Sequence, residues 1–417
     1  MIKKNQANKK SSNQENRKNQ GSDNCTMKSN YKPLGKYIQP VDERNTSLED
    51  LPLMGLSVSK VFFPTIANLV GTDMKTYKIV YRNQFTYIAD TSRRGDKIAI
   101  ALNDKFDKML ISQAYTPFEV KDSNELDPEY LMMWFRRPEF DRYARFKSHG
   151  SAREIFDWEE MCNTLLPIPP ITKQREIVKE YNTIQNRIEL NQQLIQKLEE
   201  TAQAIYREWF VEGIDLENLP EGWRVEKLKN LCIKIGSGST PTGGKESYSD
   251  SGISLIRSTN VFDYNFSFED LAFINNEQAE KLKNVVVKEN DILFNITGVS
   301  VARCCMVPKS VLPARVNQHV MIIRPDYALN TSFYLLLNLC STDSKNALLG
   351  ISQSGSTREA ITKSEIEEFQ VVVPADEILK EFEKQMSKLF SYKDLKSLEN
   401  EKLTELKALL LSKLASV

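Results

Sequence analysis

The sequence predicts an α/β protein with two tandem mixed α/β globular domains, joined by two long antiparallel coiled-coil helices in a pseudo-twofold internal repeat. Three observations predict this architecture. An apolar heptad pattern runs without interruption through residues 173–210. A second stretch, at 376–417, is rich in Leu and Lys and free of Gly and Pro. Finally, the sequence around Gly150 recurs around Gly355, 205 positions later.

The composition narrows the classes of function. The 417 residues predict two or three domains, and 56 Lys and Arg residues balance 56 Asp and Glu residues. This neutrality disfavours binding of a polyanion through a charged tail but leaves room for a local basic face. Two histidines and six cysteines without a C-x-x-C pair disfavour a zinc ribbon and predict no metal site. The scattered cysteines favour a cytoplasmic location, and no apolar run approaches the length of a membrane helix.

The first part of the chain divides into a tail and a globular domain. Residues 1–26 predict a disordered polar tail, because they hold almost nothing that could be buried. Residues 27–170 predict a mixed α/β domain, with strands at 77–81 and 97–102 and a helix at 129–147 that follows an Asp-Pro pair. Two consecutive prolines end this domain, since neither a helix nor a central strand continues through them.

The next segment, residues 171–213, predicts the first long spacer helix. Its apolar residues are spaced alternately by three and four, with Asn191 as the single polar member of the seam. A buried Asn typically fixes the register of such a seam, and we hypothesise this role for Asn191. The seam requires a partner, and the second long spacer helix at 376–417 is the obvious one. The predicted seam residues are Ile177, Tyr181, Ile184, Ile188, Asn191, Ile195, Leu198 and Ile205 in the first helix and Leu403, Leu406 and Leu410 in the second.

A second globular domain is predicted at residues 214–375, and its end repeats the end of the first. Gly150–Ile155 matches Gly355–Ala360, and the same offset places Pro169 on Pro374. Each copy closes with an acidic turn, an apolar strand, a proline and a long helix. A duplicated scaffold without a role in DNA binding stays open at this point.

The repeat also predicts a geometry. Two antiparallel helices that share a seam would hold the two globular domains at opposite ends of a rod. Such a pair of domains suits a partner that is itself a long repeating rod. Duplex DNA, read at two half-sites about one helical turn (~34 Å) apart, is a partner of this kind.

Several short sequences resemble those of one known family. They are Lys60–Leu69, Gly71–Asp73, Thr91–Ile98, Leu219–Trp223, Gly236–Pro241, Asn295–Gly298, Pro313–His319 and Gly355–Arg358. In this order, and together with two long helices, they resemble the specificity (S) subunit of a type I DNA restriction–modification enzyme. In the first copy, Asp157 stands where the resemblance leads us to expect a Ser or Thr helix cap, and Asp serves equally well.

The resemblance implies a non-catalytic subunit that binds double-stranded DNA. It implies two target recognition domains, at 27–170 and 214–375, each for one half of an asymmetric bipartite site. It also implies docking of two modification (adenine methyltransferase) subunits and of restriction (nuclease/translocase) subunits. No cofactor is then expected on this chain, and S-adenosylmethionine is expected on the modification subunit. The residues agree, because the sequence has no Asn-Pro-Pro or Asp-Pro-Pro motif and no Gly-rich S-adenosylmethionine loop.

In the first domain, the candidates for DNA contact are mostly Arg and Lys residues that lie close together in the sequence. Phosphate neutralisation by Arg and Lys supplies most of the affinity that does not depend on sequence. The alternatives are a solvated helix face with ion pairs, an ordinary hairpin tip at Arg93 and Arg94, and a structural loop at Arg153. The candidates are Arg93, Arg94, Arg136, Arg137, Arg142, Arg145, Lys147, Ser151 and Arg153.

In the second domain, the candidates are mostly uncharged polar residues of predicted loops. Gln318 and His319 precede an apolar strand, and a structural hydrogen-bonding role is expected for them. The candidates for DNA contact are Ser237, Ser239, Thr240, Arg257, Asn260, Ser356 and Arg358.

Two other classes of function stay open from the sequence. A duplicated coiled-coil adaptor that bridges proteins without DNA readout would explain the long helices and the neutral charge, but not the matched Gly-Ser-x-Arg loops. A free-standing methyltransferase is disfavoured by the missing motifs.

Overall fold

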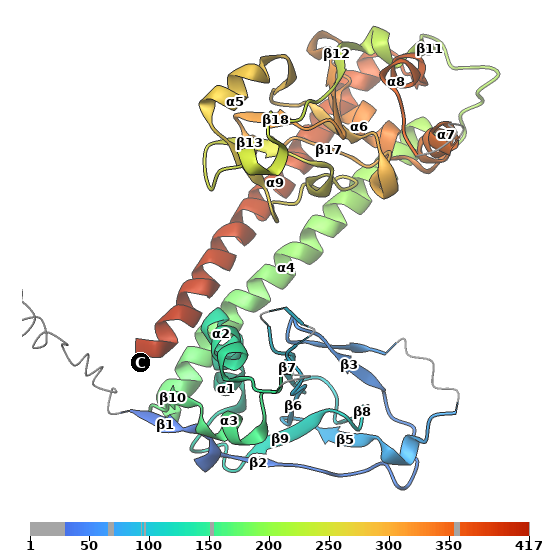
Figure 1. Ribbon diagram of the computed structural model, residues 1–417. Coiled ribbons are helices and arrows are strands. Elements are labelled where there is room, and N and C mark those ends of the chain that lie inside the picture. The colour runs from blue at the N-terminus through green and yellow to red at the C-terminus, as the bar shows by residue number, and fades with distance from the viewer. Residues whose placement is uncertain are drawn as a thin grey trace, which may run out of the picture. The chain divides into compact units, whose positions relative to one another are not determined.

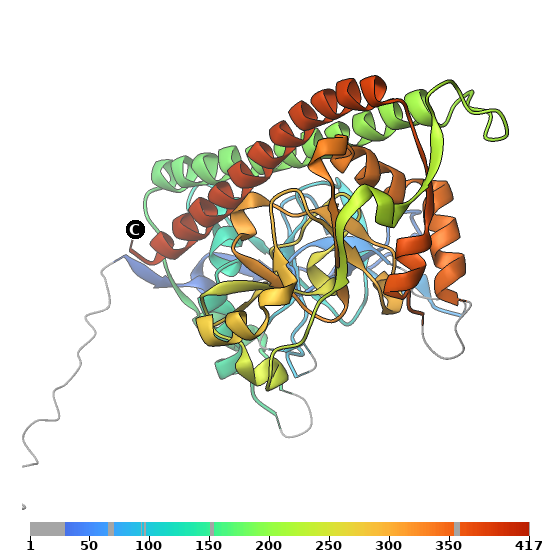
Figure 2. The same cartoon turned by 90° about the horizontal axis from the view of Figure 1, so that it is seen from above.

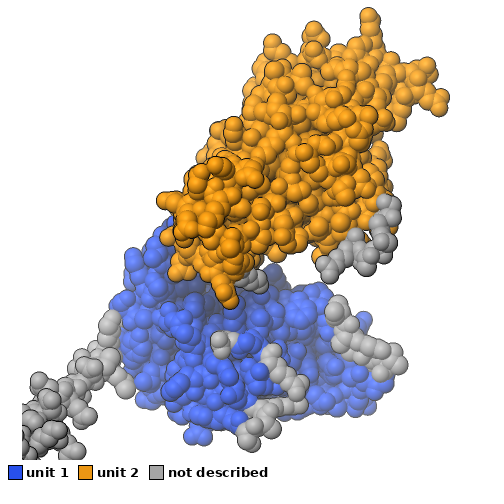
Figure 3. Space-filling model, turned by 45° about the horizontal axis from the view of Figure 1, so that its top comes forward, with its two compact units in different colours: residues 1–186, 404–417 blue, residues 187–403 orange. Residues whose placement is uncertain are grey.

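A computed structural model describes residues 30–65, 71–92, 94–95, 97–150, 154–353 and 359–416. The predicted tail at 1–26 lies outside the described residues. The chain forms two compact units, residues 1–186 with 404–417 (unit 1) and residues 187–403 (unit 2) (Figure 3). Among the described helices, none is long and apolar enough to cross a membrane.

Unit 1 is built on a four-stranded antiparallel sheet with the strand order β2-β9-β6-β7. Aromatic packing holds its core, where the rings of Phe85 and Phe118 stack with centroids 4.9 Å apart and Phe135 meets both edge-on. The strands are β1 (Tyr31–Pro33), β2 (Ile38–Pro40), β3 (Met54–Leu56), β4 (Phe62–Pro64), β5 (Lys78–Tyr81), β6 (Phe85–Tyr87), β7 (Ile100–Leu102), β8 (Lys108–Ile111), β9 (Thr116–Val120) and β10 (Leu165–Pro167).

The helices of unit 1 correct the predicted single helix at 129–147. The structure has α1 (Pro128–Phe135), α2 (Pro138–Lys147) and α3 (Trp158–Asn163). The chain breaks at Arg137, whose backbone is extended (φ −71°, ψ 135°), because the proline that follows disfavours the helical conformation. The predicted strand at 97–102 is also shorter, since only β7 pairs.

Unit 2 repeats this topology. Of its two four-stranded sheets, one has the order β12-β19-β16-β17, antiparallel throughout, and the other has the order β14-β13-β18-β15. The strands are β11 (Arg224–Lys227), β12 (Cys232–Ser237), β13 (Ile253–Ile256), β14 (Ala272–Ile274), β15 (Val286–Val287), β16 (Ile292–Asn295), β17 (Cys304–Met306), β18 (Ala314–Val316), β19 (Val320–Pro325) and β20 (Gln370–Val373). The helices are α5 (Asn276–Lys281), α6 (Ser332–Cys340), α7 (Thr342–Gln353) and α8 (Lys363–Glu368).

The internal repeat is therefore confirmed by topology. In each unit an outer strand pair, β1-β10 or β11-β20, precedes a long helix. The order β2-β9-β6-β7 in unit 1 matches the order β12-β19-β16-β17 in unit 2. Matching caps begin the short helices α3 and α8. Asp157 accepts a hydrogen bond from Glu160 N (2.9 Å), as Thr362 does from Glu365 N (3.3 Å).

Two long helices, α4 (Ile171–Phe210) and α9 (Asp376–Lys413), pack side by side and antiparallel (Figures 1 and 2). In unit 2, Arg187 Nε lies 2.6 Å from Glu399 Oε1 and Glu199 Oε1 lies 2.9 Å from Lys393 Nζ, so the partner numbers run in opposite directions. The predicted coiled-coil pair is confirmed.

The seam of α4 follows the prediction, and that of α9 does so only in part. All eight predicted α4 positions are buried or half-buried, and Asn191 is 2% exposed. Leu403 and Leu410 are half-buried, but the prediction for Leu406 is wrong, since it is 46% exposed. The inward positions of α9 fall one residue away from it, at Lys407.

Asn191 meets a second Asn across the helix pair. Its Nδ2 donates to Asn400 Oδ1 (3.0 Å), and Asn400 Nδ2 donates to the carbonyl of Ile188 (3.3 Å). The hypothesis that Asn191 fixes the register now has a specific partner, because a shifted register would separate the buried amide of Asn191 from the half-buried amide of Asn400.

Candidate nucleic-acid interface

The repeated segment contacts an equivalent turn in each unit. In unit 1, Ile155 bridges to Asp90, and Thr91 N donates to Glu154 O (3.0 Å). In unit 2, at the same repeat offset, Ala360 bridges to Thr297. The turn after β6, which includes Asp90, Thr91 and Arg94, and the turn after β16, residues 296–300, therefore occupy equivalent places. We call them the edge turns.

Strand register gathers further segments around the edge turn of unit 2. Ser237, at the end of β12, pairs with Met321, and Asn295, at the end of β16, pairs with Val320 at the start of β19. Since these strands are antiparallel neighbours, residues 237–240, 296–300 and 317–319 meet at one edge of the sheet. We call these three segments the unit 2 edge.

The unit 2 edge presents small polar groups on a close-packed backbone. Ser237, Ser239 and Thr240 are all exposed, and their contact with DNA stays a prediction. Gly238 makes the tight backbone possible, because a Cβ there would lie 2.0 Å from the carbonyl oxygen of Asn317.

Gln318 and His319 extend the same edge. His319 Nδ1 lies 2.7 Å from Thr297 Oγ1, and its backbone N donates to Asn317 Oδ1 (3.1 Å), so its expected structural role is confirmed. The Gln318 side chain is exposed, and its Nε2 lies 3.3 Å from His319 Nε2.

Val299 was missed by the sequence analysis. It is 99% exposed at the tip of the edge turn, directly after Gly298, whose φ is +71°. A single exposed apolar residue is common on protein surfaces, so Val299 is notable for its place among the polar residues of the unit 2 edge and not for its exposure alone. The Asn295–Gly298 sequence was the available signal, since it ends in a glycine that permits a sharp turn.

Two candidates are corrected because they are buried. Asn260 is 0% exposed, and its Nδ2 donates to the carbonyls of Ser267 (3.0 Å) and Glu269 (3.2 Å), which makes it a loop-closing residue. Arg137 is 6% exposed, with its guanidinium 4.3 Å from the ring centre of Trp134. Neither side chain can reach a nucleic acid without leaving its packing.

Arg257 and Arg136 are half-buried and held by neighbours. Arg257 donates to the carbonyl of Asp270 and lies over the ring of Tyr248. Arg136 lies over the ring of Tyr181, 5.7 Å from its centre. Both are weaker candidates than a free cation, because contact with DNA would cost these interactions.

The cations of α2 form ion pairs, as the alternative interpretation expects. Arg142 pairs with Glu139 (3.4 Å), Arg145 with Glu154, and Lys147 Nζ lies 3.4 Å from Glu160 Oε2. The Arg142 side chain is 68% exposed. Exposed ion pairs contribute only about 0–1 kcal/mol, so a phosphate can replace the carboxylate of Glu139 at little cost.

Arg94 belongs to the edge turn of unit 1. It is half-buried, and its Nε donates to the carbonyl of Asp90 (3.1 Å). This bond anchors one nitrogen of a guanidinium that carries five N–H donors. The remaining candidates lie outside the described residues, and they are Arg93, Ser151, Arg153, Ser356 and Arg358.

The chain is similar in sequence to a known family of proteins. The family model described as "Type I restriction modification DNA specificity domain" matches residues 7–200 and 220–408. The HindI specificity subunit of Haemophilus influenzae is 21% identical over 421 residues, covering 84% of this chain and 89% of that protein. The EcoBI specificity subunit of Escherichia coli is 24% identical over 269 residues, covering 59% and 54%.

A solved structure shares the fold. The S subunit of a type I restriction–modification system from M. genitalium superposes with a TM-score of 0.56 at 14% identity, covering 94% of this chain and 97% of that one. Two family-model matches that span both units confirm the resemblance seen in the sequence. The chain therefore belongs to the family of type I restriction–modification DNA specificity subunits.

Proposed function

We propose that this chain recognises an asymmetric bipartite DNA sequence, one half with each target recognition domain. It acts without catalysis of its own, in the cytoplasm, and docks two modification subunits and the restriction subunits. The modification subunits bind S-adenosylmethionine and methylate adenine, which requires the base to be flipped out of the duplex. The chain supplies the position on the DNA at which this chemistry occurs.

The equivalent edge turns are the single observation that carries the proposal. The same sheet order brings a turn and a repeated segment together in both units, yet the two turns differ in chemistry. In unit 1 the turn contains Arg94, and in unit 2 it contains Val299. A constant scaffold with variable side chains at one edge is the arrangement that reading two different half-sites requires.

The unit 2 edge offers groups that match base edges and phosphates. The carboxamide of Gln318 can pair with adenine through two hydrogen bonds, and Val299 can contact the methyl group of thymine. The hydroxyls of Ser237, Ser239 and Thr240 suit phosphate oxygens, which position the protein without reading sequence.

The outer face of α9 suits the partner subunits. Tyr392, Leu395 and Leu398 follow one another at helical spacing and are 45%, 57% and 45% exposed. Three neighbouring apolar side chains on a helix surface favour packing against partner helices. This face is separate from the inward positions Lys393 and Lys396, which are 7% and 9% exposed.

Methylome sequencing tests the proposed function. Cells that express this chain with its modification subunit should carry methyladenine at one bipartite sequence with unequal halves. The exchange of unit 2 residues 220–370 for those of another family member should change one half only. Methylation without a bipartite motif, or no DNA binding by the complex in a gel shift, would instead support the protein-bridging adaptor.

A further inference from the structure

Two cysteines that are distant in sequence meet in unit 2. Cys304 begins β17 and is fully buried, and Cys340 ends α6. Their sulfur atoms lie 3.2 Å apart, and both cysteines are free thiols. No local pattern indicates this pair, because the two cysteines lie 36 positions apart and neither belongs to a C-x-x-C motif.

A carboxylate completes the cluster from a third segment. Asp263 lies in the loop after β13, and its Oδ1 is 3.9 Å from Cys340 Sγ and accepts a hydrogen bond from Cys304 N (3.1 Å). The two sulfurs and a carboxylate oxygen all lie within 4.8 Å of one another. The Asp263 side chain is 42% exposed, so it connects the buried sulfurs with solvent.

We propose that Asp263, Cys304 and Cys340 form a binding site for a soft divalent cation of the Zn²⁺ type. Two thiolates and one carboxylate are ligands that Zn²⁺ prefers, and a water molecule on the exposed side of Asp263 supplies the fourth position. Tetrahedral bonds of about 2.3 Å place two sulfurs about 3.7 Å apart, so the pair has to open by only a few tenths of an ångström.

The charges at this site balance with the cation bound. Lys345 Nζ contacts Asp263 Oδ1 (2.5 Å) and also donates to the carbonyl of Ala302. With both thiols protonated, one ammonium faces one carboxylate. A divalent cation that displaces the two thiol protons leaves the cluster neutral again, with Lys345 held by Ala302.

The site lies beside the contacts that hold this domain to the long helices of unit 2. Tyr264 accepts a hydrogen bond from Lys393 of α9 through its carbonyl, and Asn265 Nδ2 donates to Glu199 of α4 (3.0 Å). Both residues follow Asp263 directly in the chain. A bound cation would hold Asp263 in place. It would thereby also restrain Tyr264 and Asn265, which bond to the two helices.

The test is titration of the full-length, reduced protein with Cd²⁺, whose bonds to thiolates absorb in the ultraviolet. We expect one Cd²⁺ per chain, with an affinity that rises with pH because two thiols must lose protons. The band should vanish in Cys304→Ser/Cys340→Ser and persist in the matched control Cys162→Ser, which lies in unit 1. No band at stoichiometric Cd²⁺, or a band that survives the double substitution, overturns the proposal.

Two variants cover the case in which a buried serine disturbs folding. Asp263→Asn, at an exposed position, should weaken Cd²⁺ binding more than about tenfold, since even outer partners of metal ligands carry that much affinity. Lys345→Met should strengthen it, because the ammonium competes for the same oxygen. Weaker Cd²⁺ binding in Lys345→Met counts against the site. None of these measurements involves DNA, so they stand apart from the proposed function.

Discussion

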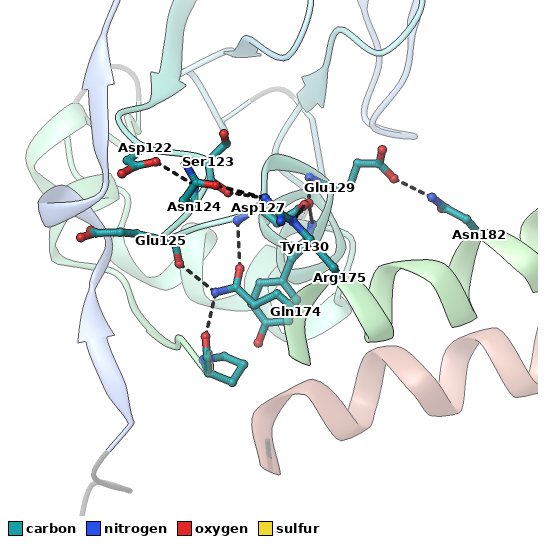
Figure 4. A network of polar contacts seen from close by, with 11 residues as sticks. Asp122, Ser123, Asn124, Glu125, Asp127, Glu129, Tyr130, Gln174, Arg175 and Asn182 are labelled. Carbon is teal, nitrogen blue, oxygen red and sulfur yellow. Dashed lines mark hydrogen bonds and ion pairs between the residues drawn. The ribbon is translucent and has the colours of Figure 1, made fainter. Parts of the chain in front are cut away.

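The junction between domain and long helix is built differently in the two units. In unit 1, α1 is capped from its own segment, because Asp127 accepts hydrogen bonds from the backbone N of Glu129 (2.9 Å) and Tyr130 (3.1 Å). The long helix α4 adds Gln174, which is 0% exposed. Its amide lies between Asp127 N (2.9 Å) and the carbonyls of Glu125 (2.9 Å) and Pro169 (2.8 Å). Figure 4 shows Gln174 beside Asp127 and Glu125.

In unit 2 the equivalent helix α6 depends on the long helix for its cap. Thr331 precedes α6 but makes no side-chain cap hydrogen bond. Instead, Glu383 of α9 accepts from Tyr334 N (2.8 Å). Burial raises the pKa of Glu383 to about 8, although the N–H groups of α6 oppose this shift.

The two junctions perform the same structural task with side chains of different chemistry. A side chain from the long helix satisfies backbone groups near the start of α1 or α6, but Gln174 is neutral and Glu383 can titrate. The junction of unit 1 should therefore hold at any ordinary pH, whereas that of unit 2 should respond to it.

The largest effect is expected from removal of Gln174. Gln174→Ala removes the partner of the N–H of Asp127, of the buried carbonyl of Pro169 and of the more exposed carbonyl of Glu125, which costs about 3 kcal/mol of unfolding free energy. Hydrogen exchange of the α1 amides should report the loss, and Gln192→Ala, at an exposed position of the same helix, is the control. Equal protection in both variants would show that the amide network does not hold the junction.

A pH-dependent effect is expected at Glu383. Its folded pKa lies above the ordinary value of 4.5, so folding favours the protonated acid, and stability falls as pH rises from about 4.5 to about 8. Glu383→Gln should remove this dependence and stabilise unit 2 most at the alkaline end. Melting temperatures measured across this range check it, with the exposed Glu381→Gln as control. A wild-type slope that survives in Glu383→Gln would place the titrating group elsewhere.

The smallest effects are expected from substitutions at the unit 2 edge and at the edge turn of unit 1, and each substitution should affect only one half-site. Gln318→Ala should relax one base of one half-site by about 1–3 kcal/mol, the value of a bidentate contact to a base. Arg94→Ala should act on the other half-site only. Methylome sequencing of each variant reports the relaxed position. If either substitution altered both halves, the assignment of one half-site to each domain would be wrong.

The features that sequence reasoning found have strong periodic signals. The α4 seam keeps its heptad spacing over the whole helix, and the offset that places Pro169 on Pro374 also relates the outer strand pairs and long helices of the two units. In α9 the same reasoning failed at Leu406, because the inward positions include Lys393 and Lys396, whose long apolar stems pack while their ammonium groups find partners. A search for apolar residues overlooks such positions.

The candidate site was harder to predict, because folding brings distant segments together. Asn260 looked like an exposed loop residue, yet it closes that loop with its own side chain. Val299 gave no chemical signal and became notable only through its exposure. Cys304 and Cys340 meet because α6 packs on β17, which no local pattern reveals.

We propose that the paired helices set the distance between the two half-sites. Insertion of one heptad into both α4 and α9, in matching places, lengthens the pair by about 10 Å, or about three base pairs. Methylome sequencing of this variant should show both half-sites unchanged and the gap between them longer by about that amount. An unchanged gap with methylation intact would contradict the account.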